Sequence, residues 1–266
     1  MELESIAALA ERLPESVVCD TAAQALLVPR GGPPKGVLER PGDVIRNLST
    51  NNSWLTVLNV EDDPAYAEMM DTALDQVQLG MRKREGEMRE RAAFILTSSP
   101  SSVTPVHFDI EHSLLMQVSG SKRVTIGRFE SEAAHRHEVD RYFDGSHGRI
   151  ESMPPELVSF DLEPGTGVYI PALVPHWVHN DPDVSISITL TYFTDASLRD
   201  SRIEDLNSRL RRLHLDPRPP GRSVVADTAK TIAIGALRIG GQLRSGIAQA
   251  RARRGVDGGT ERTNAT

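Results

Sequence analysis

The chain has 266 residues, 39% of them hydrophobic, which is enough for one large β domain with helical additions or for two small domains. A single cysteine, Cys19, excludes an intrachain disulfide and a cysteine-ligated metal cluster. The net charge of −7 is uneven, because residues 1–198 hold 16 Lys and Arg against 30 Asp and Glu, whereas residues 199–266 hold 14 against 7. An acidic body with a basic tail argues against a nucleic-acid binder, and leaves the tail as a contact to an acidic surface such as a second copy.

No targeting or membrane segment is expected. Residues 1–13 are acidic and lack the basic and apolar regions of a signal peptide. No run approaches the ~20 apolar residues of a membrane span. These features predict a cytoplasmic protein without a membrane partner.

The first third of the chain predicts helices and short strands. Apolar residues recur at helical spacing over 3–13, and the turn cluster Pro41-Gly42-Asp43 precedes a β-like run at 54–58. Asp63-Pro64 is a typical helix start, and the apolar face that follows predicts a helix ending at Gly80. The charged run 82–91 is interpreted as a solvated connection.

From residue 92 the pattern changes to strands. Strands are predicted at 93–97, 103–110, 113–118, 122–126, 158–162, 167–170 and 184–193. Ser119-Gly120-Ser121 predicts a hairpin between the third and fourth of these. Many short strands without alternating helices indicate a β-sandwich or barrel. After residue 195 helices return at 203–213 and 224–254, and residues 255–266 are expected to be disordered.

Two short stretches carry the candidate chemistry. His107 and Asp109 are separated by one residue in a β-like stretch, so they would project from one face of a strand. A further imidazole from His176 would complete a set of two histidines and one carboxylate, which suits non-haem Fe(II) with open coordination positions. His179 competes with His176, but the two differ in strand parity, and Gly165, Pro171, His176 and Asn180 follow the spacing G-x5-P-x4-H-x3-N. The remaining histidines, including His112, are interpreted as solvated.

For two of the predicted strands the sequence does not decide which face points into the protein. Lys122 shares a face with Val124 and Ile126, so it points either into the barrel, where a bound carboxylate would satisfy it, or to water at the barrel mouth. In 185–192 the hydroxyl residues alternate with aliphatic ones. The hydroxyl face is therefore either solvent-exposed or the lining of a polar cavity.

These motifs resemble the JmjC-type cupins, and more narrowly their bacterial cupin-like subgroup. The resemblance rests on Val103-Thr104-Pro105-x-His107-Phe108-Asp109, on Lys122, and on Ile170-Pro171-x4-His176-Trp177-Val178-x-Asn180, and is densest over 92–194. It implies a mainly β fold, a double-stranded β-helix (cupin or jelly roll) with N-terminal helices and a C-terminal helical extension. The domains would be 1–91, 92–198 (the cupin core), 199–254 (a basic helical extension) and 255–266 (a disordered tail).

The resemblance also implies roles for individual residues. His107, Asp109 and His176 would bind Fe(II), Lys122 would pair with the distal carboxylate of 2-oxoglutarate, Thr104 would hydrogen-bond to it, and Thr191 would be a further cosubstrate contact. Ser113 and Thr191 stand where the family commonly has asparagine, and Leu173 replaces the usual glycine of the cupin motif. These departures concern cosubstrate geometry and substrate choice.

The implied function is an Fe(II)- and 2-oxoglutarate-dependent dioxygenase that hydroxylates a C–H bond of a protein, peptide or small molecule. A non-catalytic cupin acting as sensor or scaffold is the first alternative, and another metal-cupin activity, which an outward Lys122 would favour, is the second. Arg128, Arg136 and Arg141 lie in the polar segment 128–157, which predicts a lid or a solvated loop. Ile232, Ala236, Ile239 and Leu243 predict a homodimer through the C-terminal helices.

Overall fold

The computed structural model describes residues 2–21, 25–27, 40–146 and 148–236. The chain divides into two compact units, Met1–Leu198 and a second that begins at Arg199, and each is treated by itself. In the described residues no helix is both long and apolar enough to cross a membrane.

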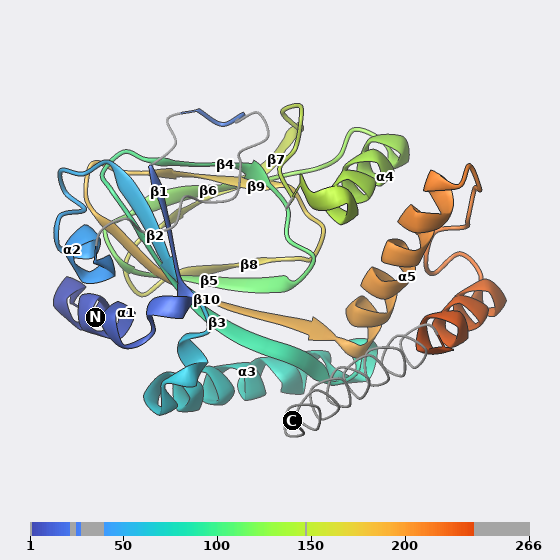
Figure 1. Cartoon of the computed structure of the whole chain (residues 1–266), viewed down its shortest axis with the longest axis horizontal. Helices are drawn as coiled ribbons and strands as arrows, with labels where there is room; N and C mark the ends of the chain where they lie inside the picture. Colours follow the sequence, from blue (N-terminus) through green and yellow to red (C-terminus); the bar gives the residue numbers. More distant parts are fainter. Residues whose placement is uncertain (1, 22–24, 28–39, 147, 237–266) are drawn as a thin grey trace, which may run out of the picture. The chain divides into compact units, whose positions relative to one another are not determined.

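A six-stranded antiparallel sheet is the larger layer of the first unit. Its strand order is β1-β2-β3-β10-β5-β8, so β10, the last strand in the sequence, pairs between β3 and β5 (Figure 1). Its strands are β1 (Val17–Thr21), β2 (Ser53–Val57), β3 (Met88–Ser98), β5 (His112–Ser119), β8 (Gly167–Ile170) and β10 (Ser185–Thr194).

A four-stranded antiparallel sheet faces it, in the order β4-β9-β6-β7. Its strands are β4 (Val103–His107), β6 (Lys122–Gly127), β7 (Glu156–Leu162) and β9 (His176–Asn180). Successive strands from β3 to β10 alternate between the layers in the manner of a jelly roll, except that β6 and β7 are consecutive and pair within the smaller sheet. The predicted mainly β, double-stranded β-helix with helical additions is therefore confirmed.

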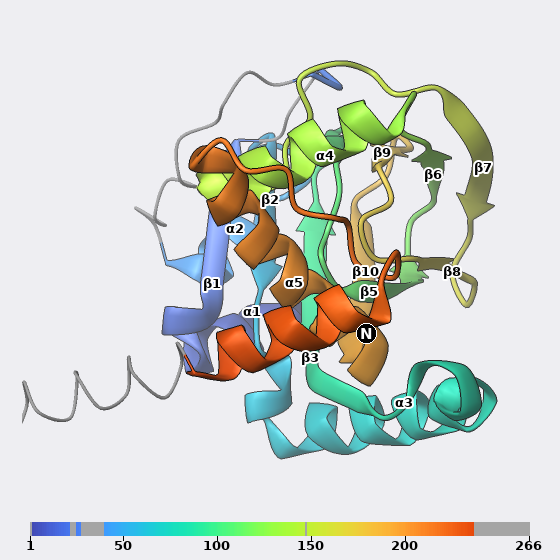
Figure 2. The same ribbon diagram turned by 90° about the vertical axis from the view of Figure 1, so that its right-hand side faces the viewer.

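Helices cover the outer side of the larger sheet. The helices α1 (Leu3–Arg12), α2 (Pro41–Arg46) and α3 (Pro64–Glu85) contribute apolar side chains to one core with β2, β3 and β10. Figure 1 shows α3 lying along β3. A fourth helix, α4 (Glu132–Arg141), lies near β9 (Figure 2). Its Val139 belongs to one buried cluster with Phe108 and Trp177. The remaining short elements are Pro14–Ser16, Val60–Asp62 and Tyr142–Ser146.

The last strand, β10, shows which of its faces is the inner one. Ile186, Ile188, Leu190 and Tyr192 pack into the core beneath the N-terminal helices. Because side chains alternate, the hydroxyl residues of β10 point between the two sheets, and all ten residues of the strand are buried. The alternative of a solvent-exposed hydroxyl face is therefore wrong.

The predicted hairpin of 113–118 with 122–126 is also wrong. The strand β5 pairs with β10 and β8, whereas β6 pairs with β7 and β9 in the opposite layer. The two-residue connection, Gly120-Ser121, crosses from one sheet to the other, and Gly120 supports it with a φ of +68°. A short polar connection that contains glycine is compatible both with a hairpin within one sheet and with a crossing between two sheets. The local sequence therefore does not distinguish these two structures.

Two helix boundaries differ from prediction. Pro41-Gly42-Asp43 begins α2 rather than a turn, because proline suits the first helical position. The helix α3 passes Gly80 and ends at Gly86, whose φ is +84°, so part of the charged run is helical. Three basic residues occupy its last turn, where the helix dipole favours cations.

The second unit continues α5 (Asp195–Arg212) and, after a loop, is helical at 224–236. The Asp227 carboxylate accepts from the backbone N–H of Gly221 at 2.8 Å and so fixes the start of that helix. Ile232 is 69% exposed. Ile239, Leu243 and the predicted tail 255–266 lie outside the described residues, and the homodimer stays a prediction.

Candidate metal centre

Three ligand-type side chains converge at one end of the space between the sheets. His107 ends β4, Asp109 follows it in the next loop, and His176 begins β9, where it is paired with His107. One ligand atom from each lies within 4.8 Å of the others. The strand β4 is shorter than predicted, so Asp109 reaches the cluster from a loop rather than from a strand face.

Both imidazoles are oriented by a hydrogen bond to the backbone carbonyl two residues earlier in the chain. The Nδ1 of His107 lies 2.8 Å from the carbonyl oxygen of Pro105, and the Nδ1 of His176 lies 3.0 Å from that of Val174. A carbonyl only accepts, so each Nδ1 must carry the proton. Each Nε2 is then left with a free lone pair, which is the arrangement that supporting hydrogen bonds impose on metal-binding histidines.

The close approach of the three side chains and their burial affect the charge of His107. The His107 and His176 rings lie 4.2 Å apart by their centroids, and the His176 Nε2 is 3.7 Å from the Asp109 carboxylate. Burial, together with the neighbouring His176, lowers the pKa of His107 to about 4. The imidazole is therefore neutral at pH 7, as metal ligation requires.

The segment before His176 is tied directly to the loop of Asp109. The backbone N–H of Leu173 donates to the Asp109 carbonyl at 2.7 Å. Leu173 has a φ of +61°, a left-handed conformation that favours glycine. The position where the resemblance leads one to expect glycine therefore does have a glycine-like backbone, and the leucine side chain instead packs beside Phe108 and Trp177.

His179 and His112 lie elsewhere. His179 is exposed and has the opposite strand parity to His176, so it faces outward. His112 is not solvated as predicted. It is half-buried and stacks on Tyr169 and Tyr192, and its Nδ1 lies 2.8 Å from the Tyr169 hydroxyl. No short-range pattern marks His112, because both aromatic partners come from distant strands.

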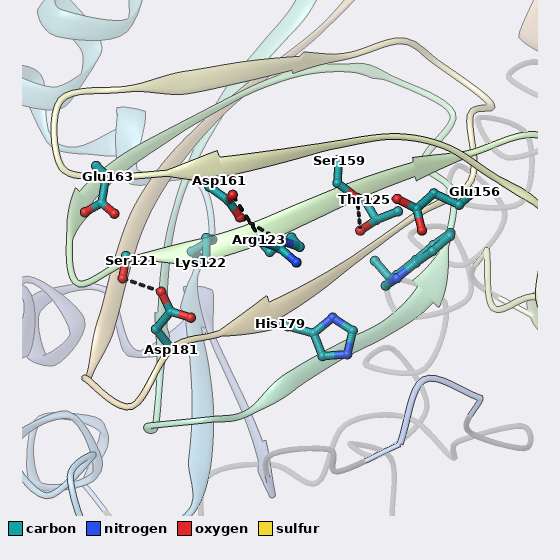
Figure 3. A pocket seen from close by; sticks show the side chains of 11 residues that line it. Ser121, Lys122, Arg123, Thr125, Glu156, Ser159, Asp161, Glu163, His179 and Asp181 are labelled. Carbon is teal, nitrogen blue, oxygen red and sulfur yellow. Dashed lines mark hydrogen bonds and ion pairs between the residues drawn. The ribbon is translucent and has the colours of Figure 1, made fainter.

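Lys122 lies on the inner face of the smaller sheet. It is 6% exposed and shares that face with Val124 and Ile126, which belong to the core between the sheets. Figure 3 shows it behind its strand, on the side opposite to Arg123. Burial lowers the pKa of Lys122 to about 7. Among the described residues no hydrogen bond or ion pair joins its ammonium group, and burial alone shifts its pKa.

Hydroxyl groups line the inner face of the larger sheet. Ser113 and Thr191 are paired residues of β5 and β10, and both are buried. The Ser113 Oγ has no partner among the described residues. Nearby, Ser187 donates to the Gln117 amide oxygen at 2.7 Å. The interior is thus polar on one wall and cationic at Lys122 on the other.

A cavity of about 190 Å³ reaches His107 from the seam between β2, β3 and β4. Thr104 lines it together with Trp54, Thr56 and Arg149. Sequence patterns did not single out Trp54 or Arg149 for this place, because strands β2 and β4 meet only through the tertiary fold. A larger hollow of about 700 Å³ lies on the outer face of the smaller sheet (Figure 3), but it excludes the three ligand-type residues, so the smaller cavity is the one relevant to the chemistry.

The polar segment 128–157 packs on the site instead of remaining a loop. The Arg141 side chain is 11% exposed and pairs with Glu138 and Glu151, so its guanidinium serves the fold and not an acidic ligand. Tyr142 follows α4 and lies against Phe108, the residue between His107 and Asp109, with ring centroids 5.7 Å apart. Arg128 is exposed.

The donor set fits a non-haem Fe(II) ion. Two imidazole nitrogens and one carboxylate on one side of an ion leave further positions open, which distinguishes this set from closed structural sites. The side chain of Asp109 is 43% exposed, whereas that of His176 is 6% exposed. The open side of the site is therefore beside Asp109.

Comparison with known proteins gives one family match. Residues 72–198 match the sequence profile of the JmjC domain. No curated protein matches the chain.

Among solved structures, the ribosomal oxygenase YcfD from Escherichia coli in complex with cobalt and 2-oxoglutarate is 16% identical, with a TM-score of 0.48 over 90% of this chain and 59% of that one. The chain thus spans about three fifths of the length of that protein. The DMSP lyase DddQ from Ruegeria pomeroyi is 14% identical, with a TM-score of 0.26 over 38% of each chain. Hydroquinone 1,2-dioxygenase from Sphingomonas sp. TTNP3 is 9% identical, with a TM-score of 0.30 over 39% of this chain and 61% of that one.

Proposed function

The chain is a JmjC-type cupin through its residues 72–198, and from this premise we propose that it is an Fe(II)- and 2-oxoglutarate-dependent oxygenase. In this proposal it hydroxylates a C–H bond of a protein, peptide or small molecule. His107, Asp109 and His176 hold the metal, and Lys122, Thr104 and Thr191 contact the cosubstrate.

The observation that carries the proposal is the pairing of a metal-type donor set with a buried cation on one sheet face. His176 pairs with Ile126, and Lys122 lies four residues further along β6, which is about 13 Å along a strand. A dicarboxylate that reaches the metal at one end can approach the Lys122 ammonium at the other. An outward Lys122 would have favoured a metal cupin that works without 2-oxoglutarate, and Lys122 is buried.

The protein's residues have distinct tasks in this scheme. The Pro105 and Val174 carbonyls orient the two imidazoles, and Lys122 neutralises the distal carboxylate in an interior with little water. When bound, Fe(II) with 2-oxoglutarate and O₂ supplies the oxidising chemistry, and the cosubstrate leaves as succinate and CO₂. The hydroxyls of Ser113 and Thr191 face the same interior and can donate to oxygen atoms of the cosubstrate.

The cavity beside His107 limits the substrate. Its volume of about 190 Å³ is below the roughly 300–1,000 Å³ of sites that enclose a whole drug-sized ligand. It suits one side chain of a protein or peptide, or a small metabolite. Trp54 and Arg149 would contact that group.

The test is succinate formation. We expect the purified protein to bind 2-oxoglutarate in the presence of Fe(II) and ascorbate and to form succinate, and we expect His107→Ala to abolish that turnover. Tight cosubstrate binding without succinate, across candidate peptides and metabolites, would support the non-catalytic alternative. Neither binding nor turnover would remove the proposal.

A further inference from the structure

The inference concerns Asn180, the last residue of β9. It faces inward like His176 and Val178, and it is 8% exposed. It is the direct cross-strand partner of Lys122. In such pairs the Cβ atoms lie only about 4.5–5.5 Å apart, so the two side chains are neighbours in the core.

The amide group of Asn180 has a determined orientation. Its Nδ2 donates to the Ser102 carbonyl at 3.1 Å and to the Ser102 Oγ at 3.0 Å. The Ser102 Oγ in turn donates to the Ser99 carbonyl at 2.7 Å. A flipped amide would set two carbonyl oxygens against each other, so the nitrogen must face Ser102.

The oxygen of the amide therefore points the other way. Ser102 lies on the β4 side of β9, whereas Lys122 lies on the β6 side. The two branches of a planar amide diverge, so Oδ1 is directed toward the β6 side. Among the described residues this buried Oδ1 has no hydrogen-bond partner.

Among the described residues, the Asn180 Oδ1 therefore lacks a hydrogen-bond donor, and the ammonium of the neighbouring Lys122 lacks an acceptor. Neither cross-strand neighbour of Lys122 carries a charge, because these neighbours are Asn180 and Leu162. Arg123, Asp161 and Asp181 lie on the outer face (Figure 3). An ammonium has three donors, enough to serve one amide oxygen and a carboxylate together.

We propose that Asn180 is a positioning residue for Lys122: the two groups are not hydrogen-bonded in this structure, but a change of rotamer of the lysine side chain lets Oδ1, held in place by Ser102, accept one Nζ–H and keep the ammonium charged and directed at a bound dicarboxylate. The part concerning the dicarboxylate rests on the proposed function. The part concerning the charge of Lys122 does not.

The charge of Lys122 can be followed by NMR. The chain has four lysines, Lys35, Lys83, Lys122 and Lys230, so protein labelled at the lysine ¹³Cε gives few signals, and Lys122→Met assigns the relevant one. A pH titration of the whole protein then gives the titration midpoint of Lys122. The affinity for 2-oxoglutarate is measured on the same samples by calorimetry at pH 7 with Mn(II).

Two substitutions at one position should move the midpoint in opposite directions. Asn180→Leu removes the acceptor, and we expect the midpoint of Lys122 to fall by about one pH unit or more. Asn180→Asp adds a negative charge, and we expect the midpoint to rise by a similar amount. Both should weaken 2-oxoglutarate binding at pH 7, the first about fivefold, because a midpoint about one unit lower leaves roughly a tenth of Lys122 charged instead of about half, and the second because its carboxylate competes with the ligand.

Thr125→Val is the matched control, because Thr125 lies on the outer face of the same strand and contacts Ser159. It should change neither quantity. An unchanged Lys122 midpoint in both Asn180 variants would overturn the inference. If Asn180→Leu does not fold, the absence of a rise in Asn180→Asp decides against it. Opposite midpoint changes in a protein that binds no 2-oxoglutarate would sustain the positioning role and defeat the proposed function instead.

Discussion

Lys122 and Arg123 are adjacent in the sequence and face opposite sides of the smaller sheet. Lys122 is 6% exposed, and its pKa is lowered to about 7 by burial. The Arg123 side chain is 59% exposed, and a hydrogen bond to Asp161 raises its pKa. One cation is bound to a partner in the protein, and the other is left for a ligand.

The same contrast holds for the two faces of the sheet. On the outer face Ser121 donates to Asp181, Arg123 to Asp161, and Thr125 is hydrogen-bonded to Ser159 (Figure 3). On the inner face the Asn180 Oδ1 has no partner among the described residues, and the His107 and His176 Nε2 atoms have free lone pairs. Polar groups that pair with each other stabilise the sheet, whereas buried groups held without a partner indicate where a ligand binds.

The largest expected effect separates the two histidines of β9. His176→Ala should weaken Co(II) binding at least 100-fold, because it removes one of the three donors, and loss of a mere supporting contact already costs about 10–100-fold. His179→Ala, on the outer face of the same strand, should change the affinity less than twofold. Calorimetric titration of both variants with Co(II) measures this. Equal losses would mean that the metal is not bound on the inner face.

The second prediction sets Lys122→Met against Arg123→Met. The first should weaken 2-oxoglutarate binding about 100-fold, because a charge-assisted contact of a buried carboxylate is lost, and the second should leave it unchanged. Calorimetry at pH 7 measures both affinities. Loss in Arg123→Met alone would place the carboxylate on the outer face.

The same pair should differ in stability. A buried cation with a lowered pKa destabilises the fold wherever it is protonated, so Lys122→Met should raise the free energy of unfolding by about 2–5 kcal/mol. Because the folded pKa is about 7 and the ordinary value is 10.5, that gain is full below pH 7 and declines as the pH rises toward 10.5. Arg123→Met loses an exposed ion pair and should change stability by about 1 kcal/mol or less. Urea unfolding at pH 6 and pH 9 tests the sign.

Local sequence patterns predicted a β-sandwich or barrel and identified the convergent residues, whereas the double-stranded β-helix was implied by the family resemblance. Strand alternation and the spacing of prolines and glycines are local properties, and they were enough to place Lys122 and Val124 on one face and to prefer His176 over His179. The layer to which β5 and β6 belong, the aromatic contacts of His112 and the pairing of Arg141 with Glu138 depend on chain segments that are far apart in sequence. The orientation of β10 likewise depends on the N-terminal helices, which cover its aliphatic face and leave its hydroxyl face directed between the sheets.

The fourth and smallest prediction concerns a contact that no local pattern reveals. Gly148 has a φ of +75°, its carbonyl accepts from the Phe108 N–H at 3.1 Å, and a Cβ there would lie 2.0 Å from the Phe108 carbonyl oxygen. Phe108 is the residue between two proposed ligands. Gly148→Ala should therefore move His107 and Asp109 apart and weaken Co(II) binding about tenfold, since ligand geometry governs affinity.

Gly165→Ala is the control for this last effect. Gly165 has a similar φ of +87°, but nothing lies within 4 Å of an added Cβ. Both variants should therefore lose about 1–3 kcal/mol of stability from backbone strain, and only Gly148→Ala should also lose metal affinity. Metal titration and urea unfolding on the two proteins separate strain from contact. If both variants bind Co(II) as tightly as the unaltered protein does, packing against Gly148 does not hold the loop of His107 and Asp109 in place. The hydrogen bonds of that loop to Pro105 and Leu173 would then be sufficient, and metal binding would tolerate a small displacement of the two ligands.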